Sequence, residues 1–177
     1  MQSDAELIEL VNRGDRQAFE SLYYRYRDWV YRLAWRFTGN RDQALDVLQE
    51  TFVYLLRKFP GFELTCSMTT FLYPVVKHVS LVMRRKAART ISEDDALAEM
   101  PAPQTTNARD SRSELAAVLS ALPGEQREVL LMRFVDDMAI DEIAEALNIP
   151  VSTAKSRLYR GLEALRHDPR TKSYFLK

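Results

Sequence analysis

The side chains best suited to binding chemistry gather near the C-terminal end, after a short turn at residues 148–150 (NIP). The turn separates an apolar-periodic segment that begins at Ile140 from another that begins at Val151. Hydroxyl and guanidinium groups suit phosphate oxygens and base edges, and the major groove of DNA admits a helix. The candidate DNA-binding residues of the second segment are Ser152, Thr153, Lys155, Ser156, Arg157 and Arg160.

These two segments have the pattern of a helix-turn-helix, because each is apolar on one side and the turn between them is short. Ser152 is expected to cap the second helix by accepting a hydrogen bond from a free backbone amide. An ordinary helical hairpin with a basic surface is the plainer alternative. The coincidence of turn, cap and basic side favours the helix-turn-helix.

A second candidate surface is the stretch 64–92, which contains no acidic residue. Its cations can hold a nucleic-acid backbone, and nearby aromatic rings can stack on unpaired bases. The alternative is that the cations are solvated and the aromatic rings are core. We expect Phe71 to be core, and for the loop 62–67 both interpretations stay open. The cations are Lys77, Arg84, Arg85, Lys86 and Arg89.

A third candidate surface is a row of carboxylates, Asp42, Asp46 and Glu50, which share one helix face because they are spaced by four. Gln49 lies beside them. The row suits docking of a basic partner, whereas composition alone favours a solvated face.

Catalysis finds no support, since the two histidines, His78 and His167, lie in different blocks and no Gly-rich phosphate loop occurs. We expect no metal and no cofactor. The lone Cys66 excludes a disulfide framework. No signal peptide or membrane-spanning run is recognisable, so the expected location is the cytoplasm.

The elements that must position these residues are helices, since apolar residues recur every three or four positions and Gly and Pro are scarce. We expect helices at about 5–12, 19–37, 45–59 and 70–86, with Gly39 as a left-handed cap. Pro74 should kink or restart the last of them. Four more are expected between 115 and 165. The predicted class is all-α, with domains at 1–89 and 113–177 and a flexible linker at 90–112.

At this point the sequence resembles a known family, the extracytoplasmic-function (ECF) sigma factors of bacterial RNA polymerase. Residues 122–134 (LPGEQREVLLMRF) and 143–161 (IAEALNIPVSTAKSRLYRG) resemble the C-terminal domain of that family. Residues 18–23 (AFESLY) and 46–52 (DVLQETF) resemble its N-terminal domain. The resemblance covers nearly the whole chain outside the linker.

The resemblance implies that the protein binds core RNA polymerase and promoter DNA and is not an enzyme. It places Asp46, Gln49 and Glu50 on the helix that docks on the polymerase. Lys77, His78, Arg84 and Arg85, with Lys86 beside them, fall on the helix that reads and melts the minus-ten element. The six helix-turn-helix residues fall on the helix that reads the minus-thirty-five element. Many members of the family are also held by an anti-sigma factor.

Three positions depart from the family pattern, which often has Trp at Phe71, Asn at His78 and Asp at Val82. These departures bear on minus-ten preference and not on the fold. A stand-alone operator-binding regulator that dimerises through its first domain is the alternative function, and an enzyme with a nucleic-acid-binding tail is a more distant one.

Overall fold

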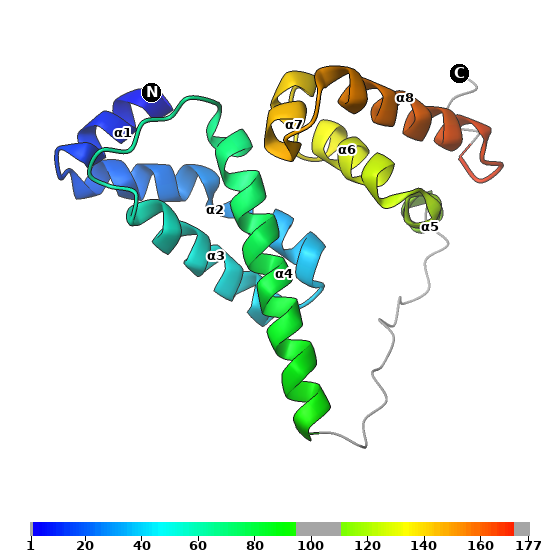
Figure 1. Cartoon of the computed structure of the whole chain (residues 1–177), viewed down its shortest axis with the longest axis horizontal. Coiled ribbons are helices and arrows are strands. Elements are labelled where there is room, and N and C mark those ends of the chain that lie inside the picture. The colour runs from blue at the N-terminus through cyan, green and yellow to red at the C-terminus, as the bar shows by residue number, and fades with distance from the viewer. Residues whose placement is uncertain (1, 95–110, 172–177) are drawn as a thin grey trace. The chain divides into compact units, whose positions relative to one another are not determined.

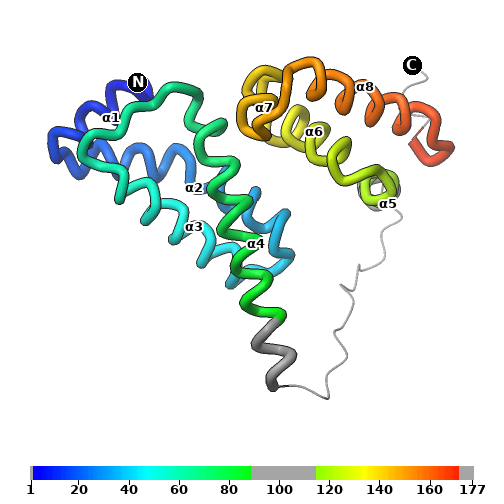
Figure 2. Tube along the Cα trace, in the orientation of Figure 1, coloured from blue at the N-terminus to red at the C-terminus, as the bar shows by residue number. Residues whose placement is uncertain are grey.

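The computed structural model describes residues 2–94 and 111–171 (Figure 1), with side chains described for 2–88 and 115–171 (Figure 2). The chain divides into two compact units, Met1–Leu97 and Ala98–Lys177. In the described ranges all regular structure is helical, which confirms the predicted all-α class with two helical units.

The first unit is built around one long helix, α2, against which the other three helices pack (Figure 1). Its interior is filled mainly by aliphatic side chains, together with aromatic ones such as Tyr73, which is 1% exposed. The Phe37 ring meets the Tyr73 ring edge-on, with 6.1 Å between centroids, and so links α2 to α4. The helices are α1 (Asp4–Asn12), α2 (Arg16–Thr38), α3 (Arg41–Leu56) and α4 (Met68–Asp94).

The turn between α2 and α3 follows from two adjacent residues. Gly39 closes α2 at φ 65°, in the left-handed region that a side chain disfavours, and this confirms the predicted cap. Asn40 then starts α3, because its side chain accepts a hydrogen bond from the Gln43 amide at 3.0 Å. The chain therefore reverses within two residues, and α3 returns along α2.

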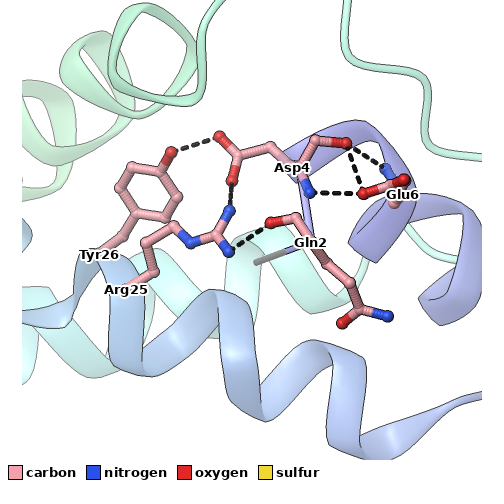
Figure 3. Close-up of polar contacts among 6 residues, drawn as sticks. Gln2, Asp4, Glu6, Arg25 and Tyr26 are labelled. Carbon is pink, nitrogen blue, oxygen red and sulfur yellow. Dashed lines mark hydrogen bonds and ion pairs between the residues drawn. The ribbon is translucent and has the colours of Figure 1, made fainter.

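Polar side chains tie α1 to α2 (Figure 3). The Asp4 carboxylate accepts hydrogen bonds from the Arg25 guanidinium and the Tyr26 hydroxyl. Arg25 also donates to the Gln2 carbonyl at 2.7 Å. Burial, followed by the bond to Asp4, raises the pKa of Tyr26, so its hydroxyl stays a donor over the ordinary pH range.

A second polar tie joins α1 to the loop between α3 and α4. The Asn12 amide nitrogen donates to the Phe62 carbonyl at 2.9 Å. Its oxygen accepts from the amides of Gly61 and Phe62, at 2.7 and 3.1 Å. One side chain thus satisfies three backbone groups of a segment about 50 positions away in the sequence.

Helix α4 differs from its prediction in two ways. It continues through Pro74, which is exposed, and does not restart there. It also ends at Asp94 instead of about Lys86. Loss of apolar periodicity marks where the helix loses its packing partners and does not mark where the helix ends. Good helix formers such as Ala87 and Ala88 allow the helix to continue beyond that point.

The linker prediction for 90–112 therefore needs correction at both edges. Residues 90–94 belong to α4, and α5 begins at Ser111. Residues 95–110, where the rest of the predicted linker falls, lie outside the described residues.

The second unit holds four helices, and its aliphatic cluster comprises Val118, Leu122, Leu130 and Leu165. The chain breaks at Pro123-Gly124, where α6 begins after the end of α5. The helices are α5 (Ser111–Ala121), α6 (Gly124–Phe134), α7 (Ile140–Leu147) and α8 (Val151–His167).

Helix α8 passes close to α6 at Gly161. A Cβ atom placed on this glycine would lie 2.7 Å from Leu130 Cδ1, which is closer than carbon atoms pack. The absence of a side chain at position 161 thus permits the close crossing of α6 and α8. This crossing positions α8, which is the second helix of the helix-turn-helix.

Candidate nucleic-acid interface

The turn between α7 and α8 has the geometry predicted for a helix-turn-helix (Figure 1). Asn148 ends α7 in the left-handed conformation, at φ 52°, which asparagine tolerates better than most residues. The Ile149 amide donates to the Ala144 carbonyl at 2.9 Å and closes the end of the helix. The second helix therefore starts three residues after the first one ends.

The prediction that Ser152 caps α8 is wrong. Pro150 occupies the N-cap position, with φ −59° and ψ 144°, and no side-chain cap is formed. Because the proline ring presets this backbone angle, α8 begins at Val151 and Ser152 lies inside its first turn. Its hydroxyl is consequently exposed and available to a ligand.

Five side chains of α8 form what we call the reading face, since their spacing places them on one side and all are exposed. Sequence reasoning missed Tyr159, whose side chain is 67% exposed and lies one turn from Ser156. An aromatic residue off the apolar periodicity, between two predicted contact residues, was the signal available. The reading face comprises Ser152, Lys155, Ser156, Tyr159 and Arg160.

Two predicted contact residues lie off the reading face. Thr153 and Arg157 are half-buried, on the side of α8 that also carries the buried Ala154 and Gly161. Arg157 makes an ion pair with Glu125 of α6, with 2.7 Å between Nη2 and Oε2. The structure thus groups only part of the predicted recognition set on one surface.

The candidate minus-ten residues form several groups along α4. His78 and Arg85 share the most exposed side, together with Pro74 and Leu81. Lys77 is half-buried and lies on a flank with Arg84, at a separation of seven residues. Lys86 follows Arg84 by two positions, so it points to another side of the helix.

The open question about the loop 62–67 is resolved for its aromatic residue. Phe62 is 8% exposed and contacts Phe59 and Phe71, with 5.4 and 4.9 Å between ring centroids. Phe71 is half-buried and also stacks on Tyr54 of α3 at 6.4 Å. Both rings therefore serve as packing, as expected for Phe71, and the loop is anchored at this end.

The other end of this loop is fixed by Ser67, whose hydroxyl accepts from the Thr70 amide at 3.2 Å and starts α4. Glu63 and Thr65, between the two anchors, are exposed. The polar middle of the loop is thus presented beside the first turn of α4.

The row of carboxylates on α3 is exposed along its length, as is Gln49. It borders an apolar groove of about 470 Å³ between α2 and α3. Leu45 and Leu56 are 45% and 51% exposed. Periodicity missed the groove because it marks apolar residues without showing which lack a partner. The groove is lined by Phe19, Tyr23, Leu45, Leu48, Gln49, Phe52, Val53 and Leu56.

Within the described ranges, no group of three or more metal-binding side chains comes together. Over the same ranges, no helix is both long and apolar enough to cross a membrane.

Comparison with known families matches both units. Residues 22–90 match the model of sigma-70 region 2, and residues 112–165 match that of sigma-70 region 4. The chain is 29% identical over 174 residues to the ECF RNA polymerase sigma factor SigW of Bacillus subtilis, covering 90% of this chain and 92% of that one. It is 28% identical to the ECF RNA polymerase sigma-E factor of Escherichia coli, covering 92% of each.

Solved structures share the fold. CnrH, solved in complex with the cytosolic domain of CnrY, superposes with a TM-score of 0.68 at 21% identity, covering 92% of this chain and 94% of that chain. The sigma factor RpoE of Bartonella quintana, solved with the anti-sigma factor NepR, gives 0.60 at 20% identity, covering 84% and 94%.

Region 2 and region 4 occur here in one chain and in the order found in sigma factors, which a stand-alone operator-binding regulator would not require. The chain belongs to the extracytoplasmic-function sigma factors, which direct bacterial RNA polymerase to initiate transcription at specific promoters.

Proposed function

We propose that this sigma factor divides its work among three helices: α3 holds core RNA polymerase, α4 reads and melts the minus-ten element, and α8 reads the minus-thirty-five element as duplex. The observation that carries the proposal is the reading face of α8. It places two hydroxyls, a phenol and two cations on one exposed side of the second helix of a helix-turn-helix.

The docking part rests on what surrounds the carboxylate row of α3. Asp46 and Glu50 are exposed beside the apolar groove that Leu45 and Leu56 help to line. Apolar contact in such a groove supplies affinity, whereas charges at its rim steer and orient the partner. A helical partner with an apolar stripe and basic neighbours fits this surface.

The minus-ten part rests on His78 and Arg85, which share the exposed side of α4. An imidazole ring stacks on an unpaired base, and a guanidinium holds phosphate. The imidazole of His78 can make fewer hydrogen bonds than the amide of the Asn often found in the family, so we propose a different base preference at this position.

The minus-thirty-five part rests on Lys155 and Arg160, whose exposed side chains flank the hydroxyls of Ser152 and Ser156. Arginine and lysine pair with guanine edges and with phosphates, and serine hydroxyls bond either. Tyr159 adds an apolar surface with a polar tip at the same place.

The remaining assignments are that the protein acts in the cytoplasm, where its polymerase and promoters are, and performs no catalysis of its own. We also propose an anti-sigma factor as a partner. RpoE of Bartonella quintana, which has the same fold, was crystallised with one.

The test uses the full chain reconstituted with core RNA polymerase. The double variant Asp46→Lys, Glu50→Lys should lose at least tenfold in affinity for core polymerase, while its thermal unfolding stays close to that of the parent. The variant Lys155→Ala, Arg160→Ala should keep its polymerase affinity but lose promoter-directed transcription.

The matched control for docking is Glu20→Lys, Asp28→Lys, which makes the same charge change on exposed positions of α2. If the control and the α3 variant bind core polymerase equally, the assignment of α3 is wrong. Undiminished transcription by the α8 variant would remove the reading face from promoter recognition.

A further inference from the structure

We propose that Arg157 is a positioning residue, which fixes the angle of α8 on α6 through Glu125 and does not touch DNA. The proposal rests on the proposed reading of duplex DNA by α8. Arg157 thus differs in role from the hydroxyls and cations around it, because it orients α8 and does not bind DNA.

The first observation is the asymmetry of the Arg157–Glu125 ion pair. The Nη2 and Oε2 atoms are 2.7 Å apart, and the arginine side chain is only 24% exposed, whereas the glutamate is 71% exposed. The guanidinium thus lies against the protein, with the carboxylate at the outer edge. Because the Arg157 guanidinium is mostly covered and Glu125 offsets its charge, DNA meets the more exposed Lys155 and Arg160 first.

The second observation is where Arg157 lies along the crossing of the two helices. Gly161, one turn later on the same side of α8, approaches Leu130 so closely that a Cβ atom would clash at 2.7 Å. Leu165, a further turn along, joins the buried cluster that contains Leu130. Arg157, Gly161 and Leu165 therefore follow one seam against α6.

The seam explains what the ion pair adds. Leu165 and Gly161 hold the C-terminal half of α8 by packing. Toward the N-terminal half, which carries Ser152, Lys155 and Ser156, the Arg157–Glu125 pair provides a charged contact with the first turn of α6. The ion pair thus adds a contact near the other end of α8, and this contact limits how far α8 can tilt on α6. Tilt decides which base edges the reading face reaches, so Arg157 governs preference and contributes no phosphate contact.

The salt dependence of promoter binding separates the two roles of an arginine. Each phosphate contact contributes about −0.9 to the slope of log affinity against log salt concentration. We expect Arg160→Gln to reduce this slope by about one, measured on holoenzyme with promoter DNA. Arg157→Gln should leave the slope unchanged while flattening the preference among minus-thirty-five bases.

A charge swap tests whether Arg157 acts through Glu125. The single variants Arg157→Glu and Glu125→Arg should each lose discrimination between the best minus-thirty-five sequence and a single-base mismatch, by about tenfold. The double variant Arg157→Glu, Glu125→Arg restores the pair with its polarity reversed and should recover most of that discrimination. A residue that touched DNA would not be rescued, because a glutamate would then face phosphate.

Two results would overturn the inference: a fall in salt slope with Arg157→Gln equal to that with Arg160→Gln, or a double variant that is folded by circular dichroism but not rescued. If the swap variants do not fold, Arg157→Gln alone decides through the salt slope. An unchanged slope for Arg160→Gln would count against the reading face itself, so failure of the two proposals is distinguishable.

Discussion

The two units differ in the contacts that position their helices. In the first unit, polar side chains join segments far apart in the sequence: Asp4 reaches Arg25 and Tyr26, and Asn12 reaches Gly61 and Phe62. In the second unit, α8 is held mainly by close packing on α6. Two other ion pairs of this unit, Arg133 with Asp137 and Asp168 with Arg170, link neighbours in sequence.

This difference has a consequence for how each unit tolerates change. A side chain that hydrogen-bonds three backbone groups can be lost while the helices around it keep their apolar contacts. A helix crossing that depends on a missing side chain can accept one only if the facing side chain or the helix itself shifts, and packed interiors deform little. We therefore expect the sharpest effects in the second unit.

The largest effect is expected from Gly161→Val. The new Cβ atom would lie 2.7 Å from Leu130 Cδ1, and its branches would push α8 away from α6. Overpacking of this kind costs about 3 kcal/mol of unfolding free energy, and promoter recognition should be lost with it. Urea unfolding of the full chain, followed with a probe in the second unit, measures the change.

Ala164→Val is the matched control, because it places the same residue on an exposed site of the same helix. It should cost only about 0.5 kcal/mol, the difference in helix propensity. Equal effects of the two variants would show that the close crossing at Gly161 contributes nothing special.

An intermediate effect is expected from Asn12→Ala. Loss of the Asn12 side-chain amide leaves the amides of Gly61 and Phe62 and the Phe62 carbonyl without this partner. We expect the free energy of unfolding to fall by about 2 kcal/mol. The loop before α4 should also loosen, so hydrogen exchange of these two amides should accelerate. Glu9→Ala, which removes an exposed pair with Arg13 on the same helix, should cost below about 0.5 kcal/mol. Unchanged hydrogen exchange of the Gly61 and Phe62 amides in Asn12→Ala would contradict the role of Asn12 in holding this loop.

Features that depend on neighbours in sequence could be predicted. Gly39 ends α2 as a left-handed cap, and Pro123-Gly124 separates α5 from α6, because both act through local backbone angles. The helix-turn-helix and the exposed carboxylates on α3 were also within reach, since spacing alone places side chains on helix faces.

Features that depend on distant partners could not. The sequence around Asn12 does not show that its side chain contacts a segment about 50 residues away. The sequence around Arg157 does not show that this residue pairs with Glu125 and lies off the reading face. Ser152 was misplaced for a different reason: proline and serine compete for the same cap, and the backbone preset by Pro150 prevailed.

The smallest effect is expected at Asp168, just after α8. It tests whether ion pairs between neighbours in sequence contribute little to the stability of the second unit. Its carboxylate accepts from the Arg170 guanidinium at 2.8 and 3.0 Å and from the Arg170 amide at 2.9 Å. These bonds lower the pKa of Asp168 to about 2, with the guanidinium as the larger cause.

The sign of the pH dependence follows from this lowered pKa. The folded chain keeps Asp168 ionised as pH falls from about 4 to about 2, whereas the unfolded chain takes up a proton there, so the contribution is present above that range and is lost within it. Carboxyl NMR titration should therefore find the Asp168 midpoint near 2 in the parent and nearer the ordinary value of about 3.9 in Arg170→Gln. At pH 7 Asp168→Asn should lower the thermal midpoint only slightly, since the pair is at the surface and water screens its contribution. A clear fall at pH 7 would mean that α8 depends on its C-terminal end as well as on the seam with α6, and the contrast between the two units would weaken.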